Sequence, residues 1–225
     1  MARFTRIETI LKMKESGLIP VFFHKDQEVC KKVVKACYDG GVRIFEFTNR
    51  GDFATLVFAS LNQWVVEELP DLVLGAGSVI DEATAAMYIS LGANFIVSPV
   101  VDEGIARICN RHKVAWSPGC GSVTEINKAH ELGAEIVKMF PGLQVGGPGF
   151  VKAVLGPMPW TNIMPTGGVE PTEESIKSWF EAGVTCVGMG SQLFPKKIID
   201  EGNLSFITNK CHHVLDMIRS SKTIR

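Results

Sequence analysis

The sequence predicts an α/β protein, a (β/α)8 TIM barrel preceded by a short helix. Eight short apolar segments recur along the 225 residues, and most are followed by a longer stretch suited to an amphipathic helix. These segments are apolar almost throughout, as parallel strands are when both of their faces are buried. Strands and helices that alternate in this way form right-handed βαβ units, and eight units in succession close into a barrel.

The chain is predicted to begin with a helix and then to alternate between strands and helices. Thr5 and Glu8 have the spacing of a capping box, and Gly17 can end this first helix in a left-handed conformation. The predicted strands are Leu18–Phe23, Val42–Phe47, Leu72–Ala76, Asn94–Val97, Val114–Trp116, Glu135–Met139, Thr161–Met164 and Val184–Gly188.

Capping residues mark several of the helices between these strands, because a short polar side chain can accept a hydrogen bond from the first helical turn. The signals are Asp52 before Phe53–Leu69, Asp81 before Glu82–Ser90, Asp102 before Glu103–Arg111, a second capping box from Ser122 to Glu125, Thr172 before Glu173–Glu181, and closing glycines at Gly92, Gly133 and Gly183. The segment Phe206–Ile218 is predicted to be one more amphipathic helix.

An open doubly wound sheet is the alternative to a barrel. The regular spacing of eight units favours the barrel, and no G-x-G-x-x-G fingerprint follows the first strand. Linkers and low-complexity tracts are absent, so we expect one domain over residues 1–225.

Composition excludes several classes of function. The 23 Lys and Arg residues nearly balance the 24 Asp and Glu residues, and no basic run could form a face for nucleic acid. No stretch approaches the roughly 20 apolar residues of a membrane span, and the amino-terminal pattern lacks a signal-peptide core. We therefore expect a cytoplasmic protein that binds neither nucleic acid nor membrane.

The cysteines and histidines give no sign of a metal site or a disulfide framework. None of the six cysteines forms a C-x-x-C pair, so free thiols are expected. The five histidines show no H-x-x-x-H or H-E-x-x-H spacing. We expect neither a metal nor a cofactor.

The carboxyl ends of the strands are where a barrel of this kind carries its active site. Lys138 ends an apolar strand there, whereas lysines usually lie on polar helix faces. Partial desolvation favours the neutral amine, which can add to a carbonyl and form a Schiff base. The pattern alone fits a structural lysine paired with a carboxylate equally well.

Glu46 has a similar position on the second predicted strand, between Phe45 and Phe47. An inward-facing carboxylate beside an amine could act as a general acid and base in carbinolamine dehydration and carbon–carbon cleavage. The alternative is a buried ion pair with Lys138 that only fills the core.

Two glycine turns follow the last two predicted strands. Gly167-Gly168 and Gly190-Ser191 stand where many barrels bind phosphate through backbone N–H groups and a helix amino terminus. Both could equally be tight turns between a strand and a helix.

These residues belong to longer segments that resemble one known family. The segments are Gly40–Arg50, Gly75–Val79, Ser98-Pro99, Pro118-Gly119, Thr124-Glu125, Lys138–Pro141, Pro165–Val169 and Gly190-Ser191. In order and spacing they resemble the 2-keto-3-deoxy-6-phosphogluconate (KDPG) / 4-hydroxy-2-oxoglutarate (KHG) aldolase family over nearly the whole chain.

The resemblance implies a class I aldolase that cleaves a 2-keto-4-hydroxy acid to pyruvate and an aldehyde without a metal. It implies Lys138 as the Schiff-base lysine, Glu46 as the proton-transfer residue, and Arg50 and Ser78 as ligands of the substrate carboxylate. It also implies Gly167, Gly168, Gly190 and Ser191 around a distal phosphate or carboxylate, Pro99 and Phe140 elsewhere in the pocket, and a homotrimer.

The chain departs from the family pattern at several positions. Many members carry an arginine soon after the first strand, where this chain has Phe23 and His24, and Val100 stands where the best-known members have glycine. We expect these differences to alter the rim that receives the aldehyde half. Ser78 replaces a usual threonine and keeps the hydroxyl, and Cys120 is interpreted as a small side chain that fills a turn.

Two other functions use the same residues. One is a barrel isomerase or epimerase with Glu46 as base and Lys138 as an electrostatic group, and the other is a non-catalytic sugar-acid or phosphate-binding protein on the same scaffold. The presence of both Lys138 and Glu46 argues against the non-catalytic protein.

Overall fold

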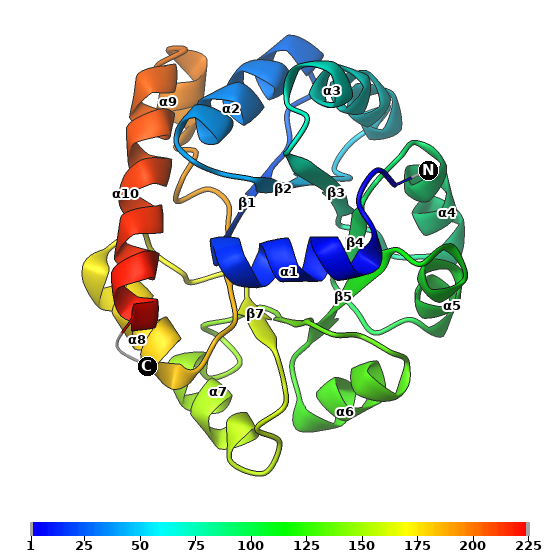
Figure 1. Ribbon diagram of the computed structural model, residues 1–225, viewed down its shortest axis with the longest axis vertical. Helices are drawn as coiled ribbons and strands as arrows, with labels where there is room; N and C mark the ends of the chain where they lie inside the picture. Colours follow the sequence, from blue (N-terminus) through cyan, green and yellow to red (C-terminus); the bar gives the residue numbers. More distant parts are fainter. Residues whose placement is uncertain (1, 224–225) are drawn as a thin grey trace.

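The computed structural model describes residues 2–223 and contains a parallel barrel of eight strands (Figure 1). The strands are β1 (Leu18–Phe22), β2 (Ile44–Thr48), β3 (Val73–Gly77), β4 (Phe95–Ser98), β5 (Ala115–Cys120), β6 (Val137–Met139), β7 (Ile163–Pro165) and β8 (Val187–Met189). Each strand pairs with the next along the chain, and β1 also pairs with β8. A single bridge between Thr166 and Gly188 joins β7 to β8 and closes the barrel. The predicted fold class is confirmed.

All eight predicted strands are present, with bounds that differ by up to a few residues. The largest difference is in β5, which continues through Pro118 and Gly119 to Cys120 instead of ending at Trp116. Thr161 precedes β7, and Val184 precedes β8, so both lie outside the strands that were predicted to contain them. Pairing with neighbouring strands sets these limits, and that pairing is not visible in the local pattern.

Helices surround the barrel. They are α1 (Arg6–Ser16), α2 (Gln27–Asp39), α3 (Ala54–Glu68), α4 (Glu82–Ser90), α5 (Glu103–His112), α6 (Val123–Glu131), α7 (Gly147–Leu155), α8 (Glu173–Ala182), α9 (Lys196–Asp200) and α10 (Leu204–Thr223). No specific cap had marked α2, α7 or α9 in the sequence, and α10 extends beyond the predicted tail helix at both ends.

Most of the predicted caps are confirmed. Thr5 and Glu8 form both halves of a capping box, and Asp81, Asp102 and Thr172 each accept a hydrogen bond from the first turn of a helix. Left-handed glycines follow the ends of α1, α4, α6 and α8, as predicted for Gly17, Gly92, Gly133 and Gly183.

Two predicted caps are wrong in detail. Asp52 does not cap α3, because the chain turns through left-handed residues at Gly51 and Phe53 and the helix begins only at Ala54. Ser122 caps α6 by accepting the N–H of Glu125, but the reciprocal hydrogen bond of a capping box is not formed. The Glu125 carboxylate accepts the N–H of Gly121 instead of that of Ser122.

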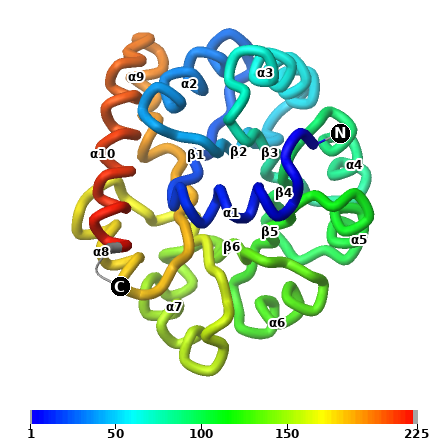
Figure 2. Tube along the Cα trace, viewed as in Figure 1, coloured from blue at the N-terminus to red at the C-terminus, as the bar shows by residue number. Residues whose placement is uncertain are grey.

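Helix α1 lies across one end of the barrel, inside the ring formed by the other helices (Figures 1 and 2). Its Met13 is fully buried against apolar side chains from the strands, including Ile19 and Ile44. The amino-terminal end of the barrel is therefore covered, and the carboxyl ends of the strands remain for a site. No helix within residues 2–223 has the length and apolar character needed to cross a membrane.

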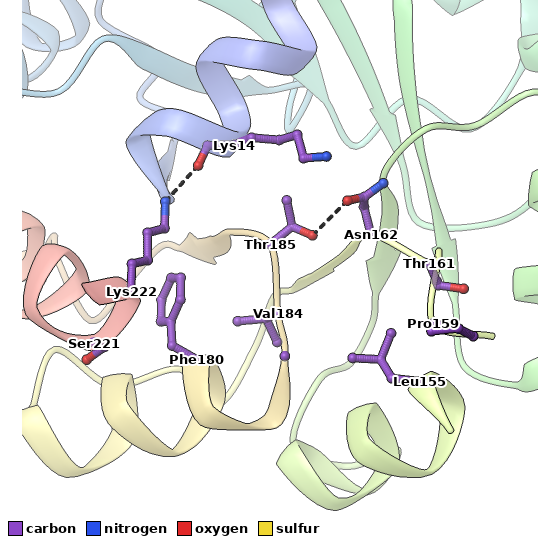
Figure 3. A pocket seen from close by; sticks show the side chains of 11 residues that line it. Lys14, Leu155, Pro159, Thr161, Asn162, Phe180, Val184, Thr185, Ser221 and Lys222 are labelled. Atoms are coloured by element: carbon purple, nitrogen blue, oxygen red, sulfur yellow. Dashed lines mark hydrogen bonds between the residues drawn. The ribbon is translucent and has the colours of Figure 1, made fainter. Parts of the chain in front are cut away.

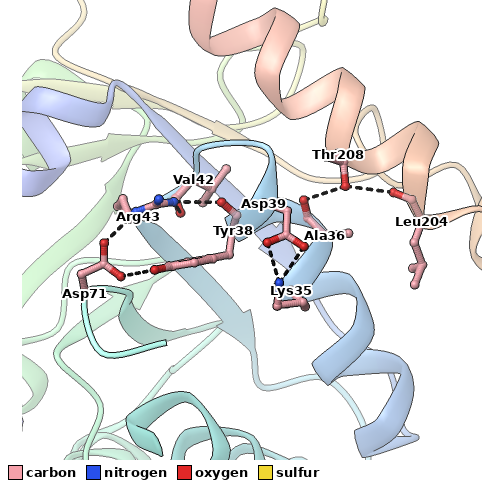
Figure 4. Close-up of polar contacts among 9 residues, drawn as sticks. All are labelled: Lys35, Ala36, Tyr38, Asp39, Val42, Arg43, Asp71, Leu204 and Thr208. Atoms are coloured by element: carbon pink, nitrogen blue, oxygen red, sulfur yellow. Dashed lines mark hydrogen bonds and ion pairs between the residues drawn. The ribbon is translucent and has the colours of Figure 1, made fainter. Parts of the chain in front are cut away.

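Polar contacts join α2 to α10 and to the loops before β2 and β3 (Figure 4). The Thr208 hydroxyl of α10 donates to the carbonyl of Ala36 in α2 at 3.0 Å. Near the end of α2, the Tyr38 hydroxyl donates to Asp71 at 2.5 Å, and the Arg43 guanidinium pairs with the same carboxylate at 2.8 Å. These contacts hold the amino-terminal ends of β2 and β3 beside α2.

Candidate active site

Lys138 and Glu46 meet inside the barrel. Lys138 Nζ lies 3.9 Å from Glu46 Oε1, and the two residues are 6% and 1% exposed. Lys138 comes from β6 and Glu46 from β2, which lie on opposite sides of the eight-stranded barrel. The prediction that Glu46 points inward toward an amine is therefore confirmed.

Glycines on β3 give Glu46 the space it occupies. Gly77 belongs to the strand beside Glu46, and a Cβ at this position would collide with the Glu46 carboxylate. One layer below, a Cβ on Gly75 would collide with the Phe95 ring. The Gly75-Ala76-Gly77 sequence thus leaves room on the inner wall of the barrel for a carboxylate and an aromatic ring.

The electrostatic state of Glu46 follows from its burial. Desolvation raises the pKa of Glu46 above its ordinary value, and the charges of Lys138 and Arg50 oppose the rise only in part. A carboxyl group in this state can hold a proton at a pH where an exposed glutamate has already lost it. That property suits a group that both donates and accepts protons.

Several buried polar groups inside the barrel lack a hydrogen-bond partner within residues 2–223. They include both carboxylate oxygens of Glu46 and the hydroxyls of Ser117 and Thr166. Buried polar atoms in folded proteins are nearly always paired, and exceptions often mark a functional site. The free polar atoms around Lys138 therefore indicate a place where a polar ligand binds.

A cavity of about 460 Å³ opens at the carboxyl ends of β1, β2, β6, β7 and β8. Six of the expected site residues line it: Arg50, Phe140, Gly167, Gly168, Gly190 and Ser191. Lys138 and Glu46 do not line the cavity, but each lies two residues before one that does: Glu46 before Thr48 on β2, and Lys138 before Phe140 just after β6. The Lys138 and Glu46 pair therefore lies beside residues that form the wall of the cavity.

Arg50 and Ser78 stand together at one side of this cavity. Arg50 Nε donates to Ser78 Oγ at 3.3 Å, across the turns that follow β2 and β3. Arg50 is the sole ionisable residue among those that line the cavity. Its guanidinium is suited to a carboxylate, because it offers several N–H donors in one plane. Ser78 does not itself line the cavity.

The two glycine turns lie side by side on the other side of the cavity. Gly167 and Gly168 have φ values of 92° and 77°, a conformation that glycine adopts without strain. A Cβ on Gly168 would collide with Leu143, so the turn also needs glycine for space. Gly190 and Ser191 adjoin this turn because β7 and β8 are neighbours.

The remaining expected pocket residues differ in their placement. Phe140 lines the cavity, and its ring centroid lies 5.1 Å from Lys138 Nζ. Pro99 lies outside the lining, where its backbone packs so closely on Gly119 that no Cβ would fit. Phe23 lines the cavity, as expected of a rim residue, whereas Val100 is exposed and does not.

Several residues that line the cavity had been given no role in the sequence analysis. They are Val21, Phe22, Thr48, Thr166, Val169, Gly188, Met189, Gln192 and Phe194. Strand alternation could have found Thr48, which is two residues after Glu46 and therefore on the same face. No local signal marks Phe194, which reaches the cavity because its ring packs edge-on against Phe22 at 5.0 Å.

The cysteines take no part in this arrangement. All six are buried and unbridged, as predicted. Burial raises the pKa of the Cys120 thiol to about 12, and its sulfur donates to the Pro118 carbonyl at 3.6 Å. Cys120 thus fills space in the core, in line with its interpretation as a packing residue. Within residues 2–223, no cluster of three His, Cys, Asp or Glu side chains could hold a metal ion.

A second cavity of about 450 Å³ lies at the opposite end of the barrel, beside the amino-terminal ends of β7 and β8 (Figure 3). Lys222 at the end of α10 donates to the carbonyl of Lys14 there at 2.7 Å, and Thr185 donates to Asn162 at 3.3 Å. None of the expected site residues lines this cavity. It is therefore separate from the Lys138 site.

Taken together, the first cavity can bind a carboxylate at Arg50 and present a carbonyl carbon to Lys138, with Glu46 next to both. A lysine amine adds to carbonyl carbons, and an adjacent carboxyl group can supply and remove the protons that the addition requires. The geometry is therefore suited to Schiff-base chemistry on a 2-keto acid.

Comparison with known proteins gives a consistent result. A sequence model of a family described as "KDPG and KHG aldolase" matches residues 8–210. The 2-dehydro-3-deoxy-phosphogluconate aldolase of Pseudoalteromonas atlantica is 31% identical over 194 residues, which are 86% of this chain and 87% of that protein.

Solved structures with the same fold are similarly related. KDPG aldolase from Legionella pneumophila, with pyruvate captured as a covalent carbinolamine intermediate, superposes with a TM-score of 0.82 at 28% identity and covers 92% of this chain and 97% of its own. The 2-keto-3-deoxy-6-phosphogluconate aldolase of Zymomonas mobilis with 3-phosphoglycerate gives 0.78 at 25% identity and covers 92% and 94%.

Proposed function

This chain belongs to the KDPG and KHG aldolase family, and we propose that it cleaves a 2-keto-4-hydroxy acid to pyruvate and an aldehyde through a Schiff base on Lys138. The chain is an aldolase, and thus a lyase. The observation that carries the proposal is the buried pair of Lys138 and Glu46, 3.9 Å apart, each two residues before a residue that lines the open cavity.

The first step is the formation of the Schiff base. The neutral Lys138 amine adds to C2 of the substrate, and the carbonyl electron pair moves to oxygen, which takes up a proton to give a carbinolamine. The added nitrogen gives up one of its protons to Glu46. Glu46 in its protonated form then donates to the carbinolamine hydroxyl, which leaves as water while the nitrogen lone pair forms the iminium. The raised pKa of Glu46 supports this role, because it favours the protonated form relative to an exposed glutamate.

The iminium then makes the carbon–carbon bond labile. The Glu46 carboxylate accepts the proton of the C4 hydroxyl, the C3–C4 bond breaks, and its electron pair flows to the iminium as an enamine. The aldehyde departs with its new carbonyl at C4. Protonation of C3 and hydrolysis of the imine release pyruvate and restore Lys138. The carbinolamine described for the Legionella relative supports the first intermediate of this sequence.

Arg50 and Ser78 are proposed to bind the pyruvate carboxylate. Arg50 supplies the charge, and its 3.3 Å hydrogen bond to Ser78 restrains the guanidinium above the Lys138 and Glu46 pair. A restrained arginine loses less conformational entropy when it binds the substrate.

The distal end of the substrate is proposed to lie between the two glycine turns. Backbone N–H groups and the Ser191 hydroxyl in such turns can bind a phosphate or carboxylate, at Gly167, Gly168 and Gly190. The Zymomonas relative is described with 3-phosphoglycerate, which supports a phosphorylated aldehyde half. Phe23 at the rim is the position where this chain differs from the arginine of many members.

We propose that the reaction needs no metal or organic cofactor. The Lys138 iminium accepts the electron pair that is released when the carbon–carbon bond breaks. In other aldolases a Lewis acid stabilises that charge. Undiminished activity after treatment with a chelator is the expected result, and a loss that added metal restores would contradict it.

We also propose a homotrimer of single-domain chains in the cytoplasm. Four large apolar side chains are exposed on neighbouring elements near α3 and α4: Phe53, Leu56, Ile80 and Met87. Large apolar side chains exposed in this way are typical of subunit contacts. Analytical ultracentrifugation should give three times the mass of the chain, and a monomer at micromolar concentration would contradict the proposal.

Trapping of pyruvate tests the catalytic proposal. Pyruvate and sodium borohydride should convert the wild-type protein to a reduced covalent adduct that intact-mass measurement detects, and Lys138→Ala should give none. Lys152→Ala is the matched control, because Lys152 lies on α7 outside the cavity and should leave the adduct unchanged. A folded wild-type protein without an adduct would overturn the proposal.

A further inference from the structure

Thr48 is the last residue of β2 and lies between two proposed site residues. Glu46 and Thr48 are two residues apart on β2 and therefore share its inward face, and Arg50, in the turn just after the strand, lines the same cavity as Thr48. Thr48 is 2% exposed and lines the cavity. The residue paired with Thr48 on β3 is Gly77, which has no side chain that could cover the Thr48 side chain.

The hydroxyl of Thr48 has no hydrogen-bond partner in the described part of the chain, residues 2–223. The hydroxyls of Ser117 and Thr166 inside the barrel are likewise unpaired, and Thr166 also lines the cavity, but Thr48 is the one of the three that lies on the strand of Glu46. A polar group buried in a cavity wall without a partner loses hydrogen bonding unless a ligand or water supplies it. Thr48 is therefore placed to meet the substrate.

We propose that the Thr48 hydroxyl donates a hydrogen bond to the C2 oxygen of the bound 2-keto acid. The inference rests on the proposed function, in which Arg50 binds the carboxylate at C1 and Lys138 attacks C2. The oxygen on C2 then lies at the level between Arg50 and Glu46, which is the level of Thr48.

The hydrogen bond has a defined role in the addition step. As Lys138 Nζ bonds to C2, the carbonyl electron pair moves onto oxygen and negative charge develops there until the oxygen is protonated. A donor that is fixed beforehand stabilises this charge more than it stabilises the neutral ketone. Thr48 keeps its own proton, and Glu46 provides the protons that are transferred.

Two substitutions separate the hydroxyl from the methyl group. Thr48→Val keeps the shape of the side chain and removes the hydroxyl, and Thr48→Ser keeps the hydroxyl and removes the methyl. The rate of pyruvate adduct formation with borohydride should fall about tenfold in Thr48→Val, as expected for one hydrogen bond to a developing charge. Thr48→Ser should remain within about twofold of wild type.

A matched control makes the same chemical change away from the cavity. Thr84 lies in the first turn of α4 and bonds to Asp81, so Thr84→Val should leave the adduct rate unchanged. Thermal unfolding of each variant checks that the fold is intact. If Thr48→Val does not fold, Thr48→Ala compared with Thr48→Ser tests the same hydroxyl.

The outcomes are distinct. A rate in Thr48→Val equal to wild type would overturn the role of Thr48 while leaving Lys138 as the Schiff-base lysine. An equal loss in Thr48→Ser and Thr48→Val would also overturn it, because the methyl group would then be the important part. Failure of the wild-type protein to form any adduct would instead refute the proposed function itself.

Discussion

Glu46 Oε1 lies 3.9 Å from Lys138 Nζ, although the two residues stand on strands at opposite sides of the barrel. Each side chain spans about half of the barrel interior, so their meeting depends on barrel closure and on the register of every strand between them. The distance exceeds that of a short ion pair, and neither Glu46 oxygen has a hydrogen bond within residues 2–223. The pair is thus arranged for a substrate more than for maximum stability.

Replacement of Glu46 by glutamine should separate substrate capture from proton transfer. Glu46→Gln keeps the size of the side chain but cannot exchange protons, so kcat for aldol cleavage should fall by roughly 10²- to 10⁴-fold. Borohydride should still trap pyruvate on Lys138, although more slowly. Steady-state kinetics and intact-mass measurement test the two parts, and wild-type turnover in Glu46→Gln would exclude Glu46 from catalysis.

The buried carboxyl group should also make the stability of the protein depend on pH. Because the pKa of Glu46 is higher in the folded protein than its ordinary value of 4.5, the folded state holds this proton in a pH range where the unfolded chain has lost it. The contribution of Glu46 to the free energy of unfolding is therefore full below that ordinary value and is lost as pH rises through the folded pKa.

Urea denaturation of wild type and Glu46→Gln over a pH series measures this contribution. The wild type should lose stability relative to the variant as pH rises above about 4.5, and the difference should level off once pH exceeds the folded pKa of Glu46. Other titrating groups contribute nearly equally to both proteins and cancel. A difference that stays constant across the series would show that burial does not shift the Glu46 pKa.

A single methyl group on β3 should displace the Glu46 carboxylate. Gly77→Ala places a Cβ where Glu46 Oε1 lies, so the Glu46 side chain has to move, and activity and stability should both decrease. The expected loss of stability is about 1–3 kcal/mol, as for overpacking in a core.

Gly149→Ala is the matched control. A Cβ on Gly149 has nothing within 4 Å, and the residue lies in α7, so alanine should keep full activity and add up to about 1 kcal/mol of stability. Denaturation midpoints and turnover numbers compare the two variants. Equal effects of the two substitutions would show that the space beside Glu46 is not restrictive.

The thiols should be unreactive in the native protein. All six cysteines are buried, and burial raises the pKa of Cys30 to about 11 and that of Cys120 to about 12, so little thiolate forms near neutral pH. A disulfide reagent such as Ellman's reagent should give no rapid phase in native protein and six thiols after denaturation. A rapid native phase would indicate an accessible cysteine.

The sequence by itself determined the succession of elements and supplied most of the residues of the proposed site. Local patterns were enough for this purpose: apolar runs for strands, polar caps such as Asp81 for helices, and the strand-end position of Lys138. These signals depend on neighbours within a few residues along the chain. The family motifs then joined Lys138 with Glu46 and Arg50 as parts of one site.

Tertiary structure alone decided how deep each of these residues lies and which other residues line the cavity beside them. The position of Thr48 beneath Arg50, the contact of Phe194 with Phe22, and the exclusion of Val100 from the cavity all depend on strands and loops distant in sequence. The start of α3 at Ala54 instead of after Asp52 has the same origin, because the turn after β2 must fit the closed barrel. Barrel closure fixes strand register and side-chain height together, and no local pattern encodes that constraint.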